Sequence, residues 1–254
     1  MIGPAESFSH IYTKSVSLPV QYIRKAVQMK KILIGLLLIL FAYNGFSQLI
    51  GEETKKRINT GFDVYTDFWL NKPEGVTSAA VNPGFTFFAL HNWPIKEDKL
   101  KFATGLDISV HNMYTNSIGV VDTNSITIFH PFDSLYPHLS YKRIKYNMIY
   151  LDIPLEIRFK SDKKFRFSAG VKVGYLIRNQ VKYVGDDFIW ETRREMKVKF
   201  NRLENFQKWR YGVYARFGWN WINFYGFYSF SNVYEKGKGP DLHQISAGIS
   251  IYPF

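Results

Sequence analysis

The stretch that decides the fold is IYLDIPLEIRF, residues 149–159. Every odd-numbered position in it is apolar, whereas the even-numbered positions hold a tyrosine, an aspartate, a proline, a glutamate and an arginine. Successive side chains of a β-strand point to opposite faces, so this alternation predicts a strand with one apolar and one charged face. Such a strand separates two surroundings of opposite polarity, and the rest of the sequence indicates which two.

The composition allows a single domain with a substantial core. The chain has 254 residues, 46% of them hydrophobic, including 22 Phe, 17 Tyr and 6 Trp. The apolar runs are too short for a membrane-spanning helix, which needs roughly 20 residues. The absence of cysteine excludes disulfides and thiolate zinc sites. In an exported protein, the net charge of +12 favours anionic lipid head groups over nucleic acid as the partner.

Residues 29–47, MKKILIGLLLILFAYNGFS, predict a signal peptide. Two lysines precede an apolar run over residues 32–42, which has the length of a signal-peptide core rather than of a membrane span. Small residues near its end predict cleavage between Ser47 and Gln48. A short buried helix is the alternative. Residues 1–28 are interpreted either as an upstream segment, with translation starting at Met29, or as an extended n-region.

Period-two alternation continues to the C-terminus and predicts eight strands. The connections after the second, fourth and sixth strands are short, and the others are long, which is typical of an outer-membrane barrel. We therefore expect an all-β fold: an eight-stranded antiparallel up-and-down transmembrane β-barrel over 57–254, with short periplasmic turns and long extracellular loops. Residues 48–56 would form a short periplasmic segment. The expected strands are about 57–70, 81–91, 99–112, 144–159, 164–182, 208–219, 221–231 and 242–254.

Paired aromatic residues give a dimension to test this prediction. Trp209 and Trp219 share a face of one strand and stand ten residues apart. At barrel tilt this is about 24 Å along the membrane normal, which matches an apolar band about 25 Å tall with an aromatic girdle at each border. Phe165 and Tyr175 repeat the spacing on another strand. These four residues predict the girdle; the core of a soluble sandwich is the alternative.

The charged faces of the strands would line a narrow lumen. Eight strands leave an interior that side chains about fill. The lining carries both signs, so its charges can pair, and we expect a plugged interior rather than an ion path. Pro154 cannot donate to the sheet ladder, so we expect a bulge there. The predicted network comprises Asp63, Asp67, Lys101, Asp107, Asp152, Glu156, Arg158, Arg166, Lys172, Arg178, Arg210 and Arg216.

Two neighbouring segments, YLDIPLEIRF and FRFSAGVKVGYLI, resemble the core of the PorT-like outer-membrane beta-barrel domain family. The resemblance rests on an L-x-I-P-L strand at 151–155 and on a small-Gly pair with a G-Y-L ending at 169–176. It implies an outer-membrane barrel and, through the namesake, a link to protein secretion. The C-terminal residues Gly248, Ile251 and Phe254 resemble the signal read by the barrel-assembly machinery.

The long loops are the expected site of activity. They combine aromatic residues with arginines and lysines, which suits an envelope protein, a glycan ligand or lipid A phosphates. An equal alternative is that the loops are hairpin extensions of the strands above the membrane and pack on each other. We expect a structural or binding protein of the cell outer membrane, an envelope accessory, with membrane lipid and the assembly machinery as partners. The alternatives are a rim-located enzyme acting on lipid or peptide and a soluble lipocalin-like barrel.

The catalytic alternative would draw on His111, His130 and His138. No two of these show a diagnostic spacing, and a G-x-S-x-G motif is absent. His130 and His138 have no third ligand at metal spacing. We therefore expect no catalytic residues, no metal and no cofactor.

Overall fold

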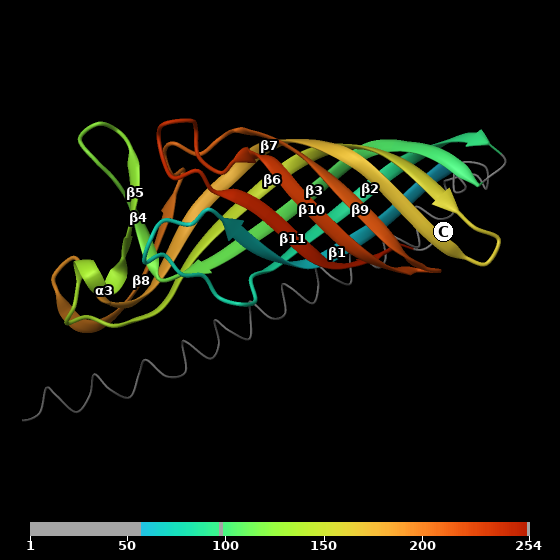
Figure 1. Cartoon of the computed structure of the whole chain (residues 1–254). Coiled ribbons are helices and arrows are strands. Elements are labelled where there is room, and N and C mark those ends of the chain that lie inside the picture. Colours follow the sequence, from blue (N-terminus) through green and yellow to red (C-terminus); the bar gives the residue numbers. More distant parts are fainter. Residues whose placement is uncertain (1–56, 97–98, 253–254) are drawn as a thin grey trace, which may run out of the picture. The chain divides into compact units, whose positions relative to one another are not determined.

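A computed structural model describes residues 57–96 and 99–252 of the chain. Within them lie eleven strands, all paired antiparallel, and one short helix, α3 (Phe132–Leu135) (Figure 1). No helix in this described part is long and apolar enough to cross a membrane. The expected signal peptide, its cleavage site at Ser47 and Gln48, the segment 48–56 and Phe254 lie outside the described residues.

Eight of the strands close into a barrel. Each pairs with its neighbour along the chain, β1 pairs with β11, and a β6–β7 pairing completes the ring. The eight-stranded up-and-down barrel predicted from the sequence is therefore confirmed. Its strands are β1 (Ile58–Leu70), β2 (Pro83–Lys96), β3 (Leu100–Thr115), β6 (Tyr141–Lys160), β7 (Phe165–Asp187), β9 (Trp209–Trp219), β10 (Ile222–Asn232) and β11 (His243–Ile251).

The barrel wall is apolar outside and polar inside. Leu151, Phe165 and Val213 are each more than a third exposed, whereas Glu156 and Arg216 are 1% exposed. In water this arrangement would expose the apolar face and desolvate the charges, so it requires lipid around the barrel. It contradicts the alternatives of a soluble lipocalin-like barrel and of a soluble sandwich.

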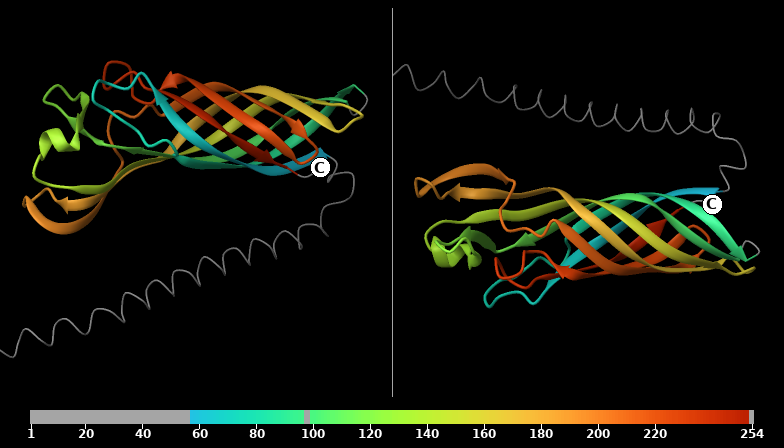
Figure 2. Two further views of the ribbon diagram at one scale, coloured as in Figure 1. Left: turned by 60° about the horizontal axis from the view of Figure 1, so that its bottom comes forward. Right: turned by 90° about the horizontal axis from the view of Figure 1, so that it is seen from above.

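The connections sort by length between the two ends of the barrel. Residues 161–164 and 220–221 make short turns at one end, and all the long connections lie at the other. Several long connections hold structure of their own: β4 (Ser117–Val121), β5 (Thr127–Pro131), α3 and β8 (Thr192–Asn201). The pairing of β7 with β8 is a hairpin extension of the kind that one sequence alternative held. Figure 2 shows β6 and β7 continuing beyond the barrel towards these elements.

The prediction of a bulge at Pro154 is wrong. On both sides of Pro154 the β3–β6 pairing keeps one register, with Thr104 opposite Leu155 and Asp107 opposite Asp152. The Thr104 hydroxyl donates to the Pro154 carbonyl oxygen at 2.7 Å, which satisfies an acceptor beside the missing N–H. The β6–β7 pairing shifts register instead at Ile149/Tyr150, where the polarity of the strand changes, and again between Tyr141 and Arg143. We call the shift at Ile149/Tyr150 the bulge.

Candidate functional site

The lumen is filled by layers of bonded polar side chains. Nearest the short turns, the Arg158 guanidinium donates to the Asn92 side-chain oxygen at 2.8 Å, and it also pairs with Glu156. Arg158 and Arg166 lie 5.5 Å and 5.3 Å from the ring of Tyr252, which is buried at this end. Only a cavity of about 30 Å³, the volume of one water molecule, remains beside them.

The next layer centres on Arg216, which crosses the lumen from β9. Its Nε and Nη2 atoms donate to the two Asp63 oxygens at 3.1 Å and 2.9 Å, and Nη1 donates to Glu156 at 2.7 Å. The guanidinium also lies 4.5 Å from the Phe88 ring and 4.9 Å from that of Tyr214. A bidentate pair between aromatic rings therefore spans the lumen at this level.

A lysine occupies the layer above. Lys172 Nζ lies 2.9 Å from Asp107 Oδ2, and both side chains are buried. The rings of Tyr214 and Phe227 lie 5.2 Å and 5.6 Å from the same nitrogen. A buried ammonium is tolerated here because an anion and the faces of aromatic rings replace its water.

The uppermost polar layer links five strands. Arg210 donates from Nε and Nη2 to Asp152 at 2.9 Å and 2.6 Å, and its Nη1 lies 2.7 Å from His111 Nε2. His111 Nδ1 lies 3.0 Å from Asp67, whose Oδ1 also accepts from Ser246 at 2.6 Å. Gly174 lies beside this layer, and a Cβ there would come 1.8 Å from Asp152 Oδ1, so only glycine leaves room for the ion pair.

Of the twelve predicted lumen residues, ten are buried inside the barrel and Lys101 is half-buried near the short turns. The prediction for Arg178 is wrong, since this side chain is exposed. The bulge shifts the register so that Ile149 pairs with Arg178 but Tyr150 with Leu176. It thereby reverses the alternation of β7, and even-numbered residues that face inward below it face outward above it. The ten are Asp63, Asp67, Asp107, Asp152, Glu156, Arg158, Arg166, Lys172, Arg210 and Arg216.

Above the polar layers, the long connections form an apolar core, which we call the cap. It combines the upper ends of four barrel strands with α3, β5 and the connections 202–208 and 233–242. The loop aromatics therefore pack on each other, as one of the two sequence alternatives held. The buried core is Trp69, Val76, Met113, Phe129, Phe132, Leu139, Ile144, Tyr146, Met148, Tyr150, Val181, Tyr183, Phe206, Val233, Tyr234 and Leu242.

Hydrogen bonds tie the pieces of the cap together. The Gly119 N–H of β4 donates to the Tyr146 hydroxyl at 2.8 Å, and the Thr127 N–H of β5 donates to the Lys238 carbonyl at 2.9 Å. Tyr183 donates to the Asp186 carbonyl at 2.8 Å, and burial raises the pKa of Tyr183 to about 12. The cap is thus an ordered structure that covers the lumen.

The four girdle residues form two cross-strand pairs on the outer surface. Phe165 lies opposite Trp219 beside the short turns, and Tyr175 lies opposite Trp209 towards the cap. Their ring centroids are 6.3 Å and 5.0 Å apart, and all four side chains are exposed. The two pairs stand towards opposite ends of the barrel wall, which is the arrangement that the predicted girdle requires.

The three histidines that the catalytic alternative would use stand on different elements. His111 is buried among the lumen charges, His130 lies on β5, and His138 follows α3 in an exposed position. Residues 57–96 and 99–252 contain no group of three His, Cys, Asp or Glu side chains placed to hold a metal ion. Gly248 and Ile251 of the C-terminal pattern lie in β11, where they pair with β1.

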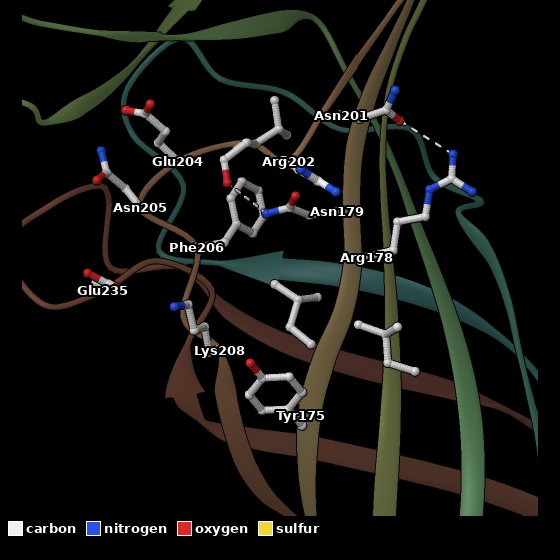
Figure 3. Close-up of a pocket in the computed structure, with 13 residues that line it drawn as sticks. Tyr175, Arg178, Asn179, Asn201, Arg202, Glu204, Asn205, Phe206, Lys208 and Glu235 are labelled. Atoms are coloured by element: carbon white, nitrogen blue, oxygen red, sulfur yellow. Dashed lines mark hydrogen bonds between the residues drawn. The ribbon is translucent and has the colours of Figure 1, made fainter.

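Two exposed surfaces remain outside the membrane. The first is the tip of the ribbon made by β7 and β8, where Ile189 and Trp190 are 59% and 79% exposed. The second is the outer face of β6, β7 and β8, which carries many cations. Beside it, a pocket of about 540 Å³ lies between residues 175–179 and the connection 201–208 (Figure 3).

Comparison with known proteins agrees with the barrel. The profile of the outer membrane protein beta-barrel domain family matches residues 46–234. No curated protein matches the sequence. Similar solved structures include Ail, the attachment invasion locus protein of Yersinia pestis, in complex with the heparin analogue sucrose octasulfate (11% identity, 78% of this chain and 97% of Ail, TM-score 0.36). A Rhodopseudomonas blastica porin mutant is also similar (8% identity, 77% and 99%, TM-score 0.21).

Proposed function

The chain belongs to the outer membrane protein beta-barrel domain family, and from this premise we propose that it is a non-conducting barrel that binds an envelope partner through its extracellular surface. The observation that carries the proposal is the closed interior: bonded charges fill the lumen, and the cap covers it. Because nothing can pass through, a function other than transport must use the outside of the cap.

The ribbon tip is the surface best suited to a protein partner. Most aromatic residues of the long loops are used in the cap, but Ile189 and Trp190 are left in water. Exposed tryptophan beside apolar neighbours is enriched in binding hot spots. The sequence resemblance to the PorT-like family supports an accessory of an envelope or secretion complex as the finer function.

Catalysis at the rim is not part of the proposal. His111 is buried, and both of its ring nitrogens are occupied, by Asp67 on one side and Arg210 on the other. A general base must reach the proton that it abstracts, and this imidazole has no free nitrogen facing a substrate. We expect substitution of His111, His130 and His138 to leave the lipid A profile unchanged.

The test has an electrical and a binding arm. The purified barrel in a planar bilayer should show no ion-conducting steps, and steady conductance would overturn the closed-lumen proposal. In cells, a photo-reactive residue at position 190 should give a defined crosslink to one envelope protein. Ile189→Ala/Trp190→Ala should remove the partner, whereas Leu135→Ala, an exposed residue of α3, should not. An unchanged complex with the double variant would contradict a role for the tip.

A further inference from the structure

A row of three lysines crosses the outer face of the extension above the membrane. Lys145 of β6 lies directly opposite Lys182 of β7, and Lys182 lies opposite Lys199 of β8. Their neighbours along β6, Ile144 and Tyr146, are buried in the cap, so the lysines point outward. Like charges placed directly opposite each other on a sheet destabilise it, so this row of three lysines lowers the stability of the extension.

Neighbouring acids do not neutralise the row. In the part of the chain that the structure describes, Lys182 and Lys199 make no ion pair, and Lys145 donates only to the neutral Asn112 oxygen, at 3.1 Å. Burial and the adjacent cations, which include Arg143 and Lys199, lower the pKa of both Lys145 and Lys182. The mutual repulsion is therefore felt at both sites.

The same face changes its chemistry in steps from the membrane upward. Tyr175 and Ile177 are exposed at the girdle, and Arg178, which the bulge turns outward, follows at once. Next comes a row of amide side chains, Asn147, Gln180 and Asn201, which face each other across the three strands. Lys182 is seven residues beyond Tyr175, about 17 Å higher at barrel tilt.

Arg178 is held at the membrane border by neutral acceptors. Its Nη2 donates to the Gln180 side-chain oxygen at 2.7 Å and lies 3.4 Å from that of Asn201. Figure 3 shows Arg178 extending towards Asn201 on one side of β7, with Lys208 on the other side of the strand. All three residues line the 540 Å³ pocket, whose wall also holds Arg202 and two carboxylates, Glu204 and Glu235. A phosphate beside Arg178 would displace no acid from that guanidinium, because its hydrogen bonds go to neutral oxygens.

We propose that a phosphorylated glycolipid of the outer leaflet lies along this face. Its phosphate would contact Arg178 at the membrane border, its sugar hydroxyls would meet the amide row, and anionic groups on its saccharide would bind Lys145, Lys182 and Lys199. The order of the chemistry supports this ligand. On the protein, apolar, cationic, amide and cationic groups follow each other, and they complement in turn the acyl chains, the phosphate, the sugar hydroxyls and the outer anionic groups of such a lipid. A soluble acidic partner would gain nothing from the apolar start of the stripe.

This inference deepens the proposed function, on which it rests, by naming a ligand for the extracellular surface beside the protein partner at the tip. The full-length mature barrel in detergent would be titrated with purified, phosphorylated lipopolysaccharide. Lys145→Gln/Lys182→Gln/Lys199→Gln should bind it on the order of 100-fold more weakly, since each cation near an anionic surface contributes roughly fivefold. Arg178→Gln should lose about fivefold.

Three controls separate the outcomes. The matched triple variant Lys72→Gln/Lys163→Gln/Lys236→Gln, at exposed lysines outside this face, should bind like the native chain. Enzymatically dephosphorylated glycolipid should bind the native chain about as weakly as the phosphorylated form binds Arg178→Gln, because the phosphate contact at the membrane border is lost in both. Heat-dependent gel mobility should show that every variant is a closed barrel.

Two results would overturn the inference: equal binding of the phosphorylated and dephosphorylated lipids, or full displacement of the lipid by an acidic peptide. Loss of glycolipid binding in the lysine variant with the crosslink at position 190 intact supports the inference. Intact glycolipid binding in the lysine variant overturns the inference and leaves the protein-partner proposal at the ribbon tip unaffected. If instead the crosslink proves absent from the native chain while the glycolipid binds, the protein-partner proposal fails and the glycolipid site stands.

Discussion

The two ends of β6 use the same strand geometry in opposite solvents. From Tyr150 towards the short turns, the inward side chains are charged, such as Asp152 and Glu156, and the outward ones are apolar. From Ile149 towards the cap, the inward side chains are apolar, such as Met148 and Tyr146, and the outward ones include Lys145. Polarity reverses where the strand leaves the lipid, so the surrounding medium, rather than the barrel shape, decides which face is the core.

The largest expected effect comes from removing Arg216, the central cation of the lumen. Arg216→Ala should destabilise the barrel by about 3–5 kcal/mol, because Asp63 would be left buried and unpaired and Glu156 would keep only Arg158. Unfolding in denaturant, followed by the heat-dependent shift on gels, measures this. Arg178→Ala, at an exposed arginine, should cost no more than about 0.5 kcal/mol. Equal midpoints for the two variants would mean that the lumen charges contribute nothing.

The upper part should respond to loss of apolar volume instead. Phe132 is fully buried at the start of α3, so Phe132→Ala should cost the cap about 3–5 kcal/mol. Hydrogen exchange should rise in β4, β5 and α3 while the barrel amides stay protected. Leu135→Ala, on the exposed side of the same helix, is the control. Exchange that rises equally throughout the barrel would show that the two parts are one cooperative unit.

A third variant sharpens the contrast on the outer face. Lys182→Gln removes the middle charge of the lysine row and should stabilise the extension, by less than about 1 kcal/mol because water still reaches this half-buried site. The same change should weaken glycolipid binding. Exchange rates of the β7 and β8 amides at low salt would detect the gain, which salt should reduce. A loss of protection at low salt would contradict the assigned repulsion.

The smallest expected effect is a pH dependence of the ribbon. Hydrogen bonds from Lys142, and then from Lys197, lower the pKa of Glu195 from 4.5 to about 2. A carboxylate with a lowered folded pKa stabilises above its unfolded pKa, and this contribution is lost as the pH falls from about 4.5 towards 2. Amide exchange in β8 should therefore rise in that window. Glu195→Gln should lose this part of the response, and the remainder belongs to Asp186, whose pKa the Ser140 N–H lowers.

The barrel could be predicted from the sequence, but the cap could not. Alternation in 149–159 predicted both the strand and its inside-out burial, because a strand that meets lipid on one face has a single consistent pattern. For the long loops, hairpin extensions were only one of two equal alternatives and had no bounds, since their apolar residues serve a local core among segments far apart in the chain. Phe129 and Tyr234, for example, have rings 5.9 Å apart although a hundred residues separate them.

Arg178 shows why one lumen residue was misplaced. Its position continues the even-numbered series of Arg166 and Lys172, and only the register shift at Ile149/Tyr150 takes it out of that series. A bulge depends on how two strands pair, and no local sequence signal marked it here. The proline that did carry a signal, Pro154, was accommodated by the Thr104 hydroxyl without a bulge.

The cross-lumen bonds of Arg216 have a consequence for how the chain is assembled. Asp63 lies on the first strand and Arg216 on the sixth of the ring, 153 positions later in the chain. An open, half-built sheet in the membrane would therefore hold several lone charges, and each would gain its counterion only when the two edges join. The cross-lumen ion pairs therefore form together when the barrel closes. This favours an abrupt final step of biogenesis over gradual curling of the sheet, and partly closed intermediates should be scarce.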